Sequence, residues 1–275
     1  MNLKVTQLFI YPVKSCGGLE VSSFELGAAG PEAFFGGSKL PDRGWMFIDA
    51  EGKFLTQRSL SRMALIQPIW ENGQFSLQIE QKKFEIPLEM PSPLRENVSI
   101  WGHPDSAALV PGDVSQAASD FLKTPVRMVQ FDSMSRREAQ VKGQKLGVQT
   151  RFTDSQPYLI ISEESLKDLN SRMQSPVGPE RFRANIWVSG AGQPFQEDHY
   201  RKLEHKEFHL EPTKPCARCK IITIDPVKGE ILDSEPLKVL SQYRRRETQV
   251  YFGQYYLTHQ FGGVLSVGHT LETTL

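Results

Sequence analysis

Two cysteines three positions apart carry the clearest chemical signal in this sequence. They bound the segment Cys216-Ala217-Arg218-Cys219, which precedes a β-rich run at residues 220–226. A thiolate is a ligand that soft or high-valent metals select, and a neighbouring arginine favours the charged form of a thiol. Cys-x-x-Cys pairs also occur in thiol redox couples and as half of a zinc site. The pair therefore indicates thiolate chemistry without choosing among these uses.

Four other segments place polar or charged residues within β-rich, apolar surroundings. They are residues 11–18 (YPVKSCGG), 41–45 (PDRGW), 153–157 (TDSQP) and 181–186 (RFRANI). Three cations, Lys14, Arg43 and Arg183, fall near the ends of expected strands. The neutral hydrogen-bonding residues are Ser15, Ser155, Gln156 and Asn185. Cations beside turn amides form a site for a phosphate and a polar heterocycle.

Composition sets limits on the partners and the compartment. Lys plus Arg and Asp plus Glu both number 32, so no net field attracts nucleic acid or an anionic membrane. Three cysteines are too few for the disulfide framework of a secreted protein and favour a reducing compartment. No signal peptide precedes the first strand, and no window reaches the roughly 18 apolar residues of a membrane span. We expect a cytoplasmic protein with no nucleic-acid or membrane partner.

Short β-type runs dominate the first hundred residues. They cover residues 3–10, 45–49, 63–70, 74–80, 83–86 and 98–101. Glu51-Gly52 and Asn72-Gly73 are hairpin-type turns, because their residues tolerate a positive φ. Many short strands with regular turns predict a small barrel or sandwich.

The sequence pattern changes after Pro111 from short β-type runs to a helical pattern, and this predicts a domain boundary. Asp113 or Ser115 begins a helix whose apolar residues share one face and which ends before Pro125. With 275 residues the chain exceeds the usual size of one domain. We expect one domain at residues 1–120 and a second at residues 121–275.

The second domain is expected to be mainly β with a few helices, which makes the whole chain α+β. Residues 134–150 are polar, rich in Lys and Arg and without apolar period, which predicts a long surface loop or lid. Ser162 caps a second helix after a strand at residues 158–161. Further strands are expected at residues 186–189, 206–210, 219–225, 249–257 and 264–267.

These motifs together resemble those of a known family, the MOSC-domain molybdenum-cofactor proteins with an N-terminal β-barrel. This family includes the mitochondrial amidoxime-reducing component and its bacterial relatives. The opening YPVKSC, the DRGW segment, FRANI, the CARC pair with Asp225-Pro226, and the closing Val267-Gly268 occur in family order with similar spacing. The resemblance covers nearly the whole chain. It implies an N-terminal β-barrel domain and a MOSC β-barrel domain, with the cofactor in the cleft between them.

The resemblance also implies roles for individual residues. The cofactor is molybdenum with a single pyranopterin, and Cys219 is its metal ligand, whereas Cys216 is a neighbour. Asp154 joins Cys219 as a catalytic residue. The residues implied to bind the cofactor are Lys14, Ser15, Arg43, Ser155, Gln156, Arg183, Asn185, Ala217 and Arg218. Gln156 departs from the family pattern, in which a small hydroxylated residue is more usual.

The implied activity is removal of an oxygen atom from N-hydroxylated compounds such as amidoximes, hydroxylamines and base analogues. Two electrons then come from outside, because the Cys-x4-Cys-x2-Cys spacing of a [2Fe-2S] domain is absent and the chain holds no iron–sulfur cluster. Either a separate donor protein of the flavin, ferredoxin or cytochrome type supplies them, or a C-terminal iron–sulfur domain is missing from this sequence by loss or truncation. The missing N-terminal anchor agrees with a bacterial-type soluble form.

Several alternatives stay open at the level of sequence. The protein could carry the cofactor, or sulfur on Cys219, without turnover, or it could be a zinc or thiol-redox module using both cysteines. Cys16 and Cys216 have packing roles as alternatives to functional ones. Arg58 is equally a site residue or half of a structural ion pair. The runs Arg136-Arg137 and 244–246 are solvated loops or a docking patch for an acidic donor.

Overall fold

The structure is a computed structural model that describes residues 1–90, 94–231 and 234–275. Strands dominate it, and three α-helices lie among the described residues. The expected class, mainly β with some helix, is confirmed. In the described parts of the chain, no helix has both the length and the apolar character needed to cross a membrane.

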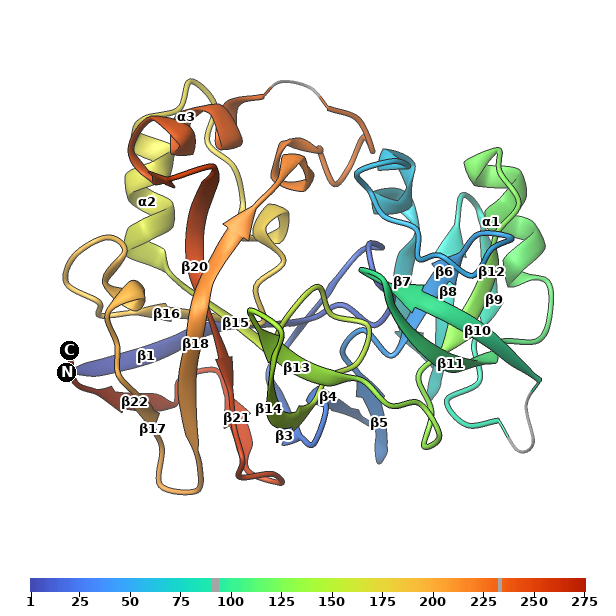
Figure 1. The fold of residues 1–275 in the computed structure, drawn as a ribbon, viewed down its shortest axis with the longest axis horizontal. Helices are drawn as coiled ribbons and strands as arrows, with labels where there is room; N and C mark the ends of the chain where they lie inside the picture. Colours follow the sequence, from blue (N-terminus) through green and yellow to red (C-terminus); the bar gives the residue numbers. More distant parts are fainter. Residues whose placement is uncertain (91–93, 232–233) are drawn as a thin grey trace.

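Seven strands close into a barrel on one side of the molecule (Figure 1). In ring order they are β15 (Tyr158–Ser162), β16 (Ile186–Ser189), β1 (Asn2–Ile10), β22 (Thr270–Thr273), β17 (Leu203–Glu204), β18 (His209–Arg218) and β20 (Gln249–Leu257). The ring closes because β15 pairs with β16 on one side and with β20 on the other. Two short strands extend it: β2 (Leu19–Val21) on β1 and β19 (Arg245–Arg246) on β20.

Strand β1 joins the beginning of the chain to its later part. It pairs antiparallel with β16 through Leu8 and Ile186, and with β22 through Asn2 and Glu272. Leu3 and Val5 are buried while Asn2 and Lys4 are exposed, which is the period-2 pattern of a strand with one face on a core. The barrel therefore contains residues from both expected domains, and the boundary at residue 120 stays a prediction.

Four smaller sheets make up the rest of the strands. One contains β10 (Arg95–Ile100), β11 (His103–Leu109), β12 (Arg127–Gln130) and β6 (Trp45–Ile48). The second contains β21 (Val264–Ser266), β3 (Ser23–Gly27), β4 (Gly30–Phe35) and β5 (Ser38–Pro41). The third contains β7 (Gln67–Glu71), β8 (Gln74–Ile79) and β9 (Lys82–Glu85), and the fourth is the hairpin of β13 (Glu138–Val141) and β14 (Gln144–Gln149). The Asn72-Gly73 turn joins β7 to β8 with positive φ at both residues, as predicted.

The helices lie outside the sheets. Helix α1 (Val114–Leu122) contacts β8 and β12, while α2 (Glu163–Ser171) and α3 (Glu235–Tyr243) contact each other beside the barrel (Figure 1). Ser162 caps α2 as predicted, since its Oγ accepts a hydrogen bond from the Ser165 amide at 3.2 Å. The short 3-10 helices are η1 (Ser61–Leu65), η2 (Pro179–Phe182), η3 (Gln196–Asp198) and η4 (Lys220–Thr223).

The predicted strand at residues 219–225 was wrong, because this segment forms η4. Its run of branched residues fits a strand by type, but Ile221, Ile222 and Thr223 are all buried. The tight turn of η4 buries these side chains because it packs against α3 and η2. Strands β7 and β18 also begin later than predicted, because residues 61–65 form η1 and the chain turns before His209.

The predicted loop or lid at residues 134–150 was wrong as well, because most of it is the β13–β14 hairpin. Within the two strands of this hairpin only Ala139 and Val148 are buried. Two apolar positions are too few to produce a recognisable period-2 pattern in the sequence. The turn residues Lys142 and Gly143 both have positive φ, which suits a two-residue hairpin turn.

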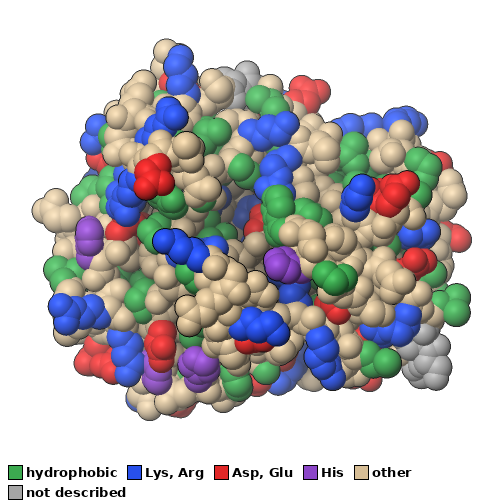
Figure 2. Space-filling model, in the orientation of Figure 1, with side chains coloured by type: hydrophobic (Ala, Val, Ile, Leu, Met, Phe, Trp, Pro, Cys, Tyr) green, Lys and Arg blue, Asp and Glu red, His purple; other side chains and the backbone are tan. Residues whose placement is uncertain are grey.

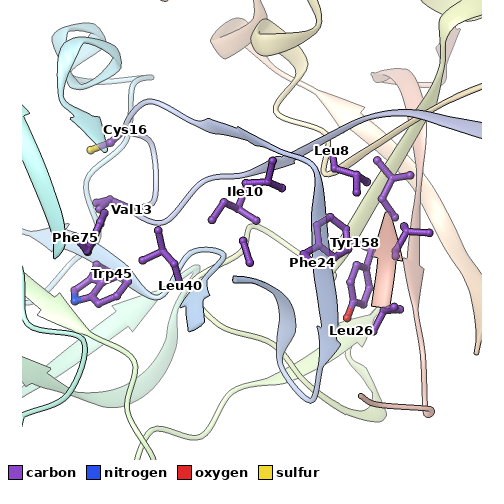
Figure 3. Packing of buried hydrophobic residues seen from close by; sticks show 14 of the residues in the cluster. Leu8, Ile10, Val13, Cys16, Phe24, Leu26, Leu40, Trp45, Phe75 and Tyr158 are labelled. Carbon is purple, nitrogen blue, oxygen red and sulfur yellow. The ribbon is translucent and has the colours of Figure 1, made fainter. Parts of the chain in front are cut away.

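One hydrophobic cluster runs along the segment that follows β1 (Figure 3). Leu8 lies near Tyr158 of the barrel, whereas Val13 lies near Trp45 and Phe75 of the smaller sheets, and Ile10 lies between the two groups. Burial of both ends fixes residues 8–16 in place. The backbone of Lys14 and Ser15 is thus held between the barrel and the smaller sheets.

Candidate functional site

A cleft beside the end of β18 collects most of the predicted site residues. It contains about 670 Å³ of space outside protein atoms, counting its open mouth. Figure 2 shows a hollow near the centre of one face, with Lys and Arg side chains around it. The lining residues are Lys14, Ser15, Arg43, Thr153, Asp154, Gln156, Leu159, Phe182, Arg183, Asn185, Cys216, Ala217, Arg218, Cys219, Ile221 and Tyr255.

The two cysteines of the CARC segment have different surroundings. Cys219 follows the last residue of β18 and is partly exposed, and Arg58 Nη1 lies 3.8 Å from its Sγ. Cys216 is 2% exposed, and its Sγ accepts a hydrogen bond from Arg218 Nη1 at 3.1 Å. Both cysteines line the cleft, and Cys219 is the more exposed of the two.

Lys14 and Asp154 form an ion pair at one wall. Lys14 Nζ donates to Asp154 Oδ1 at 2.5 Å and to the carbonyl of Phe152 at 2.9 Å. Burial lowers the pKa of Lys14 to about 8, although Asp154 opposes that shift. Burial alone would raise the pKa of Asp154, but the Lys14 ammonium holds it well below its usual range. Asp154 is thus a carboxylate at neutral pH, with 42% of its side chain exposed.

Arg43 and Arg183 are two further cations of the cleft lining. Arg43 Nη1 lies 2.6 Å from Asp42 Oδ2, and its Nη2 donates to the carbonyl of Arg183 at 3.0 Å. Asp42 is 1% exposed and also accepts from the Tyr11 amide at 2.8 Å. Both guanidinium groups lie over the Tyr11 ring, at 4.6 and 4.3 Å from its centroid. Asn185 Oδ1 lies 3.4 Å from Arg43 Nη1.

The charges in the cleft do not balance. Four of the described lining residues are cations, namely Lys14, Arg43, Arg183 and Arg218. Asp154 pairs with Lys14, and Asp42, just behind the lining, pairs with Arg43, which leaves Arg183 and Arg218 without a carboxylate partner among the described residues. Burial, and then repulsion from Arg43, lower the pKa of Arg183 to about 10. An excess of buried positive charge is costly unless an anion compensates it.

Three buried polar atoms of the cleft lining have no hydrogen-bond partner among the residues that the structure describes. They are Arg183 Nη2, Arg218 Nε and Gln156 Oε1. Two donors and one acceptor left open beside excess positive charge fit an anionic ligand that also carries hydrogen-bonding ring atoms. The residues present therefore suit a phosphate-bearing heterocycle.

The structure brings together all the predicted site residues except Ser155. Ser155 lines an adjacent groove. Gln156 lines the cleft, and its Nε2 donates to the Gln140 carbonyl at 2.8 Å. Arg58, which the sequence left undecided, contacts Cys219. Burial raises the pKa of Cys16 to about 12, and its carbonyl accepts from Arg183 Nη1 at 2.6 Å.

Sequence reasoning missed several residues that build the cleft. Asp42 holds Arg43, and its position beside that arginine was a usable signal. Thr153 and Phe182 line the cleft from two of the polar segments that the sequence singled out, although neither was named as a site residue, and Leu159, Ile221 and Tyr255 line it from expected strands. Burial raises the pKa of Tyr255 well above its ordinary value. Phe182 belongs to the FRANI motif, which was a usable signal, whereas no pattern in the sequence points to Tyr255.

Two other groups of residues lie elsewhere. Arg244 and Arg246 both bond Asp198 Oδ2, at 2.6 and 2.8 Å, which is an ion-pair role. His209 pairs with Glu211, and the described residues contain no group of three or more His, Cys, Asp or Glu side chains that could hold a metal ion.

Comparison with known sequences gives the family. Residues 2–125 match the MOSC N-terminal beta barrel domain, and residues 148–272 match the MOSC domain. Human mitochondrial amidoxime-reducing component 1 is 33% identical to this chain over 96% of the chain and 81% of that protein. The chain belongs to the MOSC-domain family.

Two further relatives of this MOSC-domain protein show the breadth of the match. Human mitochondrial amidoxime reducing component 2 is 32% identical over 94% of the chain and 80% of its own length. The molybdenum cofactor sulfurase of Oryza sativa is 29% identical over 92% of the chain but only 32% of the sulfurase. The family resemblance and the two expected kinds of domain are confirmed.

Proposed function

We propose that this protein is a molybdenum-cofactor-dependent reductase of N-hydroxylated compounds. The observation that carries the proposal is a cleft with excess buried positive charge and one accessible thiol, in a chain similar to the amidoxime-reducing components. The substrates would be amidoximes, hydroxylamines or N-hydroxylated base analogues. A separate protein would deliver the electrons.

The residues present fit a pyranopterin cofactor with a single pterin. Cys219 would ligate the metal, because it is the partly exposed cysteine of the pair, whereas Cys216 is buried and its Sγ accepts a hydrogen bond from Arg218. Arg43 and Arg183 would neutralise the pterin phosphate, and the unpartnered Nη2 of Arg183 supplies a free donor. Arg218 Nε and Gln156 Oε1 would meet polar ring atoms. When bound, the cofactor supplies two-electron oxygen-atom transfer.

Protein groups would position the substrate and provide charge. Reduction of an N–OH group to N–H consumes two electrons and two protons and releases water. Asp154 is ionised, so it would accept a hydrogen bond from the substrate N–OH or amidine N–H. Lys14, whose pKa is lowered to about 8, would be a proton source at near-neutral pH. Arg58 places a fixed positive charge beside Cys219.

Carriage of the cofactor without turnover is the second candidate. Similarity to a molybdenum cofactor sulfurase over 92% of the chain favours it, because that relative is named for cofactor chemistry. Both functions would use the same cleft. A carrier would release the cofactor and would not reduce an amidoxime when a chemical electron donor is supplied.

The decisive experiment measures metal first and turnover second. The protein is purified from a host that makes the cofactor, beside Cys219→Ser and the matched control Cys216→Ser. We expect near-stoichiometric molybdenum by elemental analysis in the wild type and in Cys216→Ser, and a loss in Cys219→Ser. The loaded protein should then reduce benzamidoxime with reduced viologen as donor.

Three outcomes would contradict the proposal. Absence of molybdenum in the wild type removes the cofactor assignment. Zinc that is lost equally in both cysteine variants supports a zinc module instead. Stoichiometric molybdenum without reduction of any N-hydroxylated compound favours the carrier.

A further inference from the structure

Trp101 has an unusual backbone conformation at the turn between β10 and β11. Ile100 pairs with His103, so Trp101 and Gly102 form a two-residue loop. Both have positive φ, 54° and 79°. Asn, Asp or Gly normally takes the first position of such a turn, and a bulky residue there is strained. Strain of this kind is typical of functional positions.

The indole of Trp101 is both exposed and supported from beneath. Its exposed fraction is 49%, which is high for a tryptophan. The Arg58 guanidinium lies 4.4 Å from its ring centroid, and the Phe54 ring contacts it edge-on at 5.0 Å. These contacts fix the ring while leaving part of its surface open to solvent.

This ring is close to the proposed reaction centre. Arg58, which lies over Trp101, places Nη1 3.8 Å from Cys219 Sγ. Trp101 also lines a groove together with Asp154, Ser155 and Lys214. Asp154 lines the cofactor cleft as well, so the groove and the cleft meet at that carboxylate. A small molecule in the groove would touch Trp101 and Asp154 before reaching Cys219.

We propose that Trp101 is a specificity-determining residue, a stacking surface that selects N-hydroxylated substrates with a flat aromatic or heteroaromatic ring. This inference rests on the proposed function. The ring of the substrate would stack on the exposed indole, while its N–OH group points to Asp154 and the cleft. Offset stacking of two aromatic rings is favourable beyond the burial of apolar area. A substrate without a ring, such as hydroxylamine, gains nothing from this surface.

Two substitutions separate the stacking role from the turn. Trp101→Asn removes the ring and places a residue that tolerates positive φ, so the fold should be kept or stabilised. Trp101→Phe keeps an aromatic face. The measurement is the ratio of kcat/KM for benzamidoxime to kcat/KM for hydroxylamine, since a general loss of activity cancels in that ratio. We expect it to fall on the order of tenfold in Trp101→Asn and to stay near the wild-type value in Trp101→Phe.

Direct binding makes the test independent of turnover. The dissociation constant of benzamidoxime, measured by calorimetry on the holoprotein, should rise on the order of tenfold in Trp101→Asn only. Equal constants in the wild type and both variants would overturn the role of Trp101. Turnover of both substrates with an unchanged ratio would also overturn it and would leave the proposed reductase function standing. Wild-type protein that binds benzamidoxime through Trp101 but reduces nothing would contradict the reductase function alone.

Discussion

At the scale of single residues, several residues that line the cleft have a left-handed backbone conformation. Ser15, Arg43 and Arg183 have φ values of 64°, 47° and 55°, and all three line the site. Such conformations cost on the order of 1–3 kcal/mol each and persist where the surrounding structure holds them. Here the tight turns bring main-chain and side-chain donors to one place. The strain and the unbalanced charge both indicate a protein that is stabilised when the cleft is filled.

The lowered pKa of Lys14 predicts a pH effect on the cofactor-free protein. Its pKa is about 8 in the folded state and 10.5 ordinarily, so between these values the unfolded chain binds more protons. The free energy of unfolding therefore rises with pH across that window. Below about pH 8 the buried ammonium of Lys14 destabilises the folded state by its full amount. Lys14→Met cannot titrate. Across this pH window, the free energy of unfolding of the wild type should rise by up to about 3 kcal/mol relative to that of Lys14→Met.

Urea unfolding followed by circular dichroism at several pH values gives this difference directly. Taking the difference between the two proteins removes the contributions of Cys16 and the buried tyrosines, which titrate in both. Parallel stability curves from pH 7 to about pH 10.5 would show that Lys14 is not buried as a cation.

Most site residues could be predicted from the sequence because they are charged or polar residues in apolar surroundings. Lys14, Arg43 and Arg183 stood out for that reason. Ser155 lies where the chain bends and lines the adjacent groove, a placement that the type of the residue does not reveal. Trp101 was hidden because an aromatic residue at the end of a strand looks ordinary. Only the φ value and the exposure of its ring reveal it.

At the scale of elements, helix α2 is fixed to the barrel by a buried carboxylate. Glu197 is fully buried, and burial raises its pKa. Ser162 Oγ donates to Glu197 Oε2 at 2.8 Å, and Ser165 Oγ donates to Oε1 at 2.8 Å. The residue that caps the helix is thus also a partner of the carboxylate.

Ser162→Ala should therefore lower the free energy of unfolding by more than the loss of an ordinary helix cap does. Loss of the cap costs about 1 kcal/mol, and leaving a buried carboxyl oxygen without its donor costs about 1–3 kcal/mol. We expect a decrease of roughly 2–4 kcal/mol in the free energy of unfolding, measured by urea denaturation. Ser171→Ala is the matched control, because Ser171 is an exposed serine of the same helix. A loss below about 1 kcal/mol in Ser162→Ala would mean that Glu197 finds other partners.

The elements that sequence predicted wrongly share a physical cause. In η4 and in the β13–β14 hairpin, contacts with distant segments override local pattern. The branched residues of η4 are buried by α3 and η2, and β13 and β14 gain their order by pairing with each other. The strands with a clear period, such as β1 and β20, were predicted closely because both faces of the pattern are visible in the sequence.

At the scale of the whole molecule, the barrel depends on residues from both ends of the chain. Strand β1 lies between β16 and β22, and the two ends of the chain lie together (Figure 1). Without β1, both neighbours would expose unpaired edges, and the cavity left by Leu3, Val5 and Leu8 would open the core. The later part of the chain is thus incomplete by itself.

A fragment of residues 121–275 is accordingly expected not to fold. It should show no cooperative unfolding transition and should bind an apolar dye, measured by circular dichroism and fluorescence. The matched control is the full chain with a protease site inserted at the Gly36-Gly37 turn, where both φ values are positive and nothing lies near. That chain should stay folded after cleavage. A cooperatively unfolding 121–275 fragment would instead make the later domain autonomous.

The closure of this ring also sets when the barrel can be completed during synthesis. Strand β22 ends at Thr273 and bridges β1 to β17, so the seven-stranded ring cannot close while those last residues are still inside the ribosome. Strands β1 and β18, which precede Lys14 and Cys219, are joined on the other side of the ring through β16, β15 and β20, so β22 is the strand that completes the closure. A chain truncated before Thr270 therefore leaves β1 and β17 without the strand that joins them, and it offers a ligand an open sheet in place of a closed barrel.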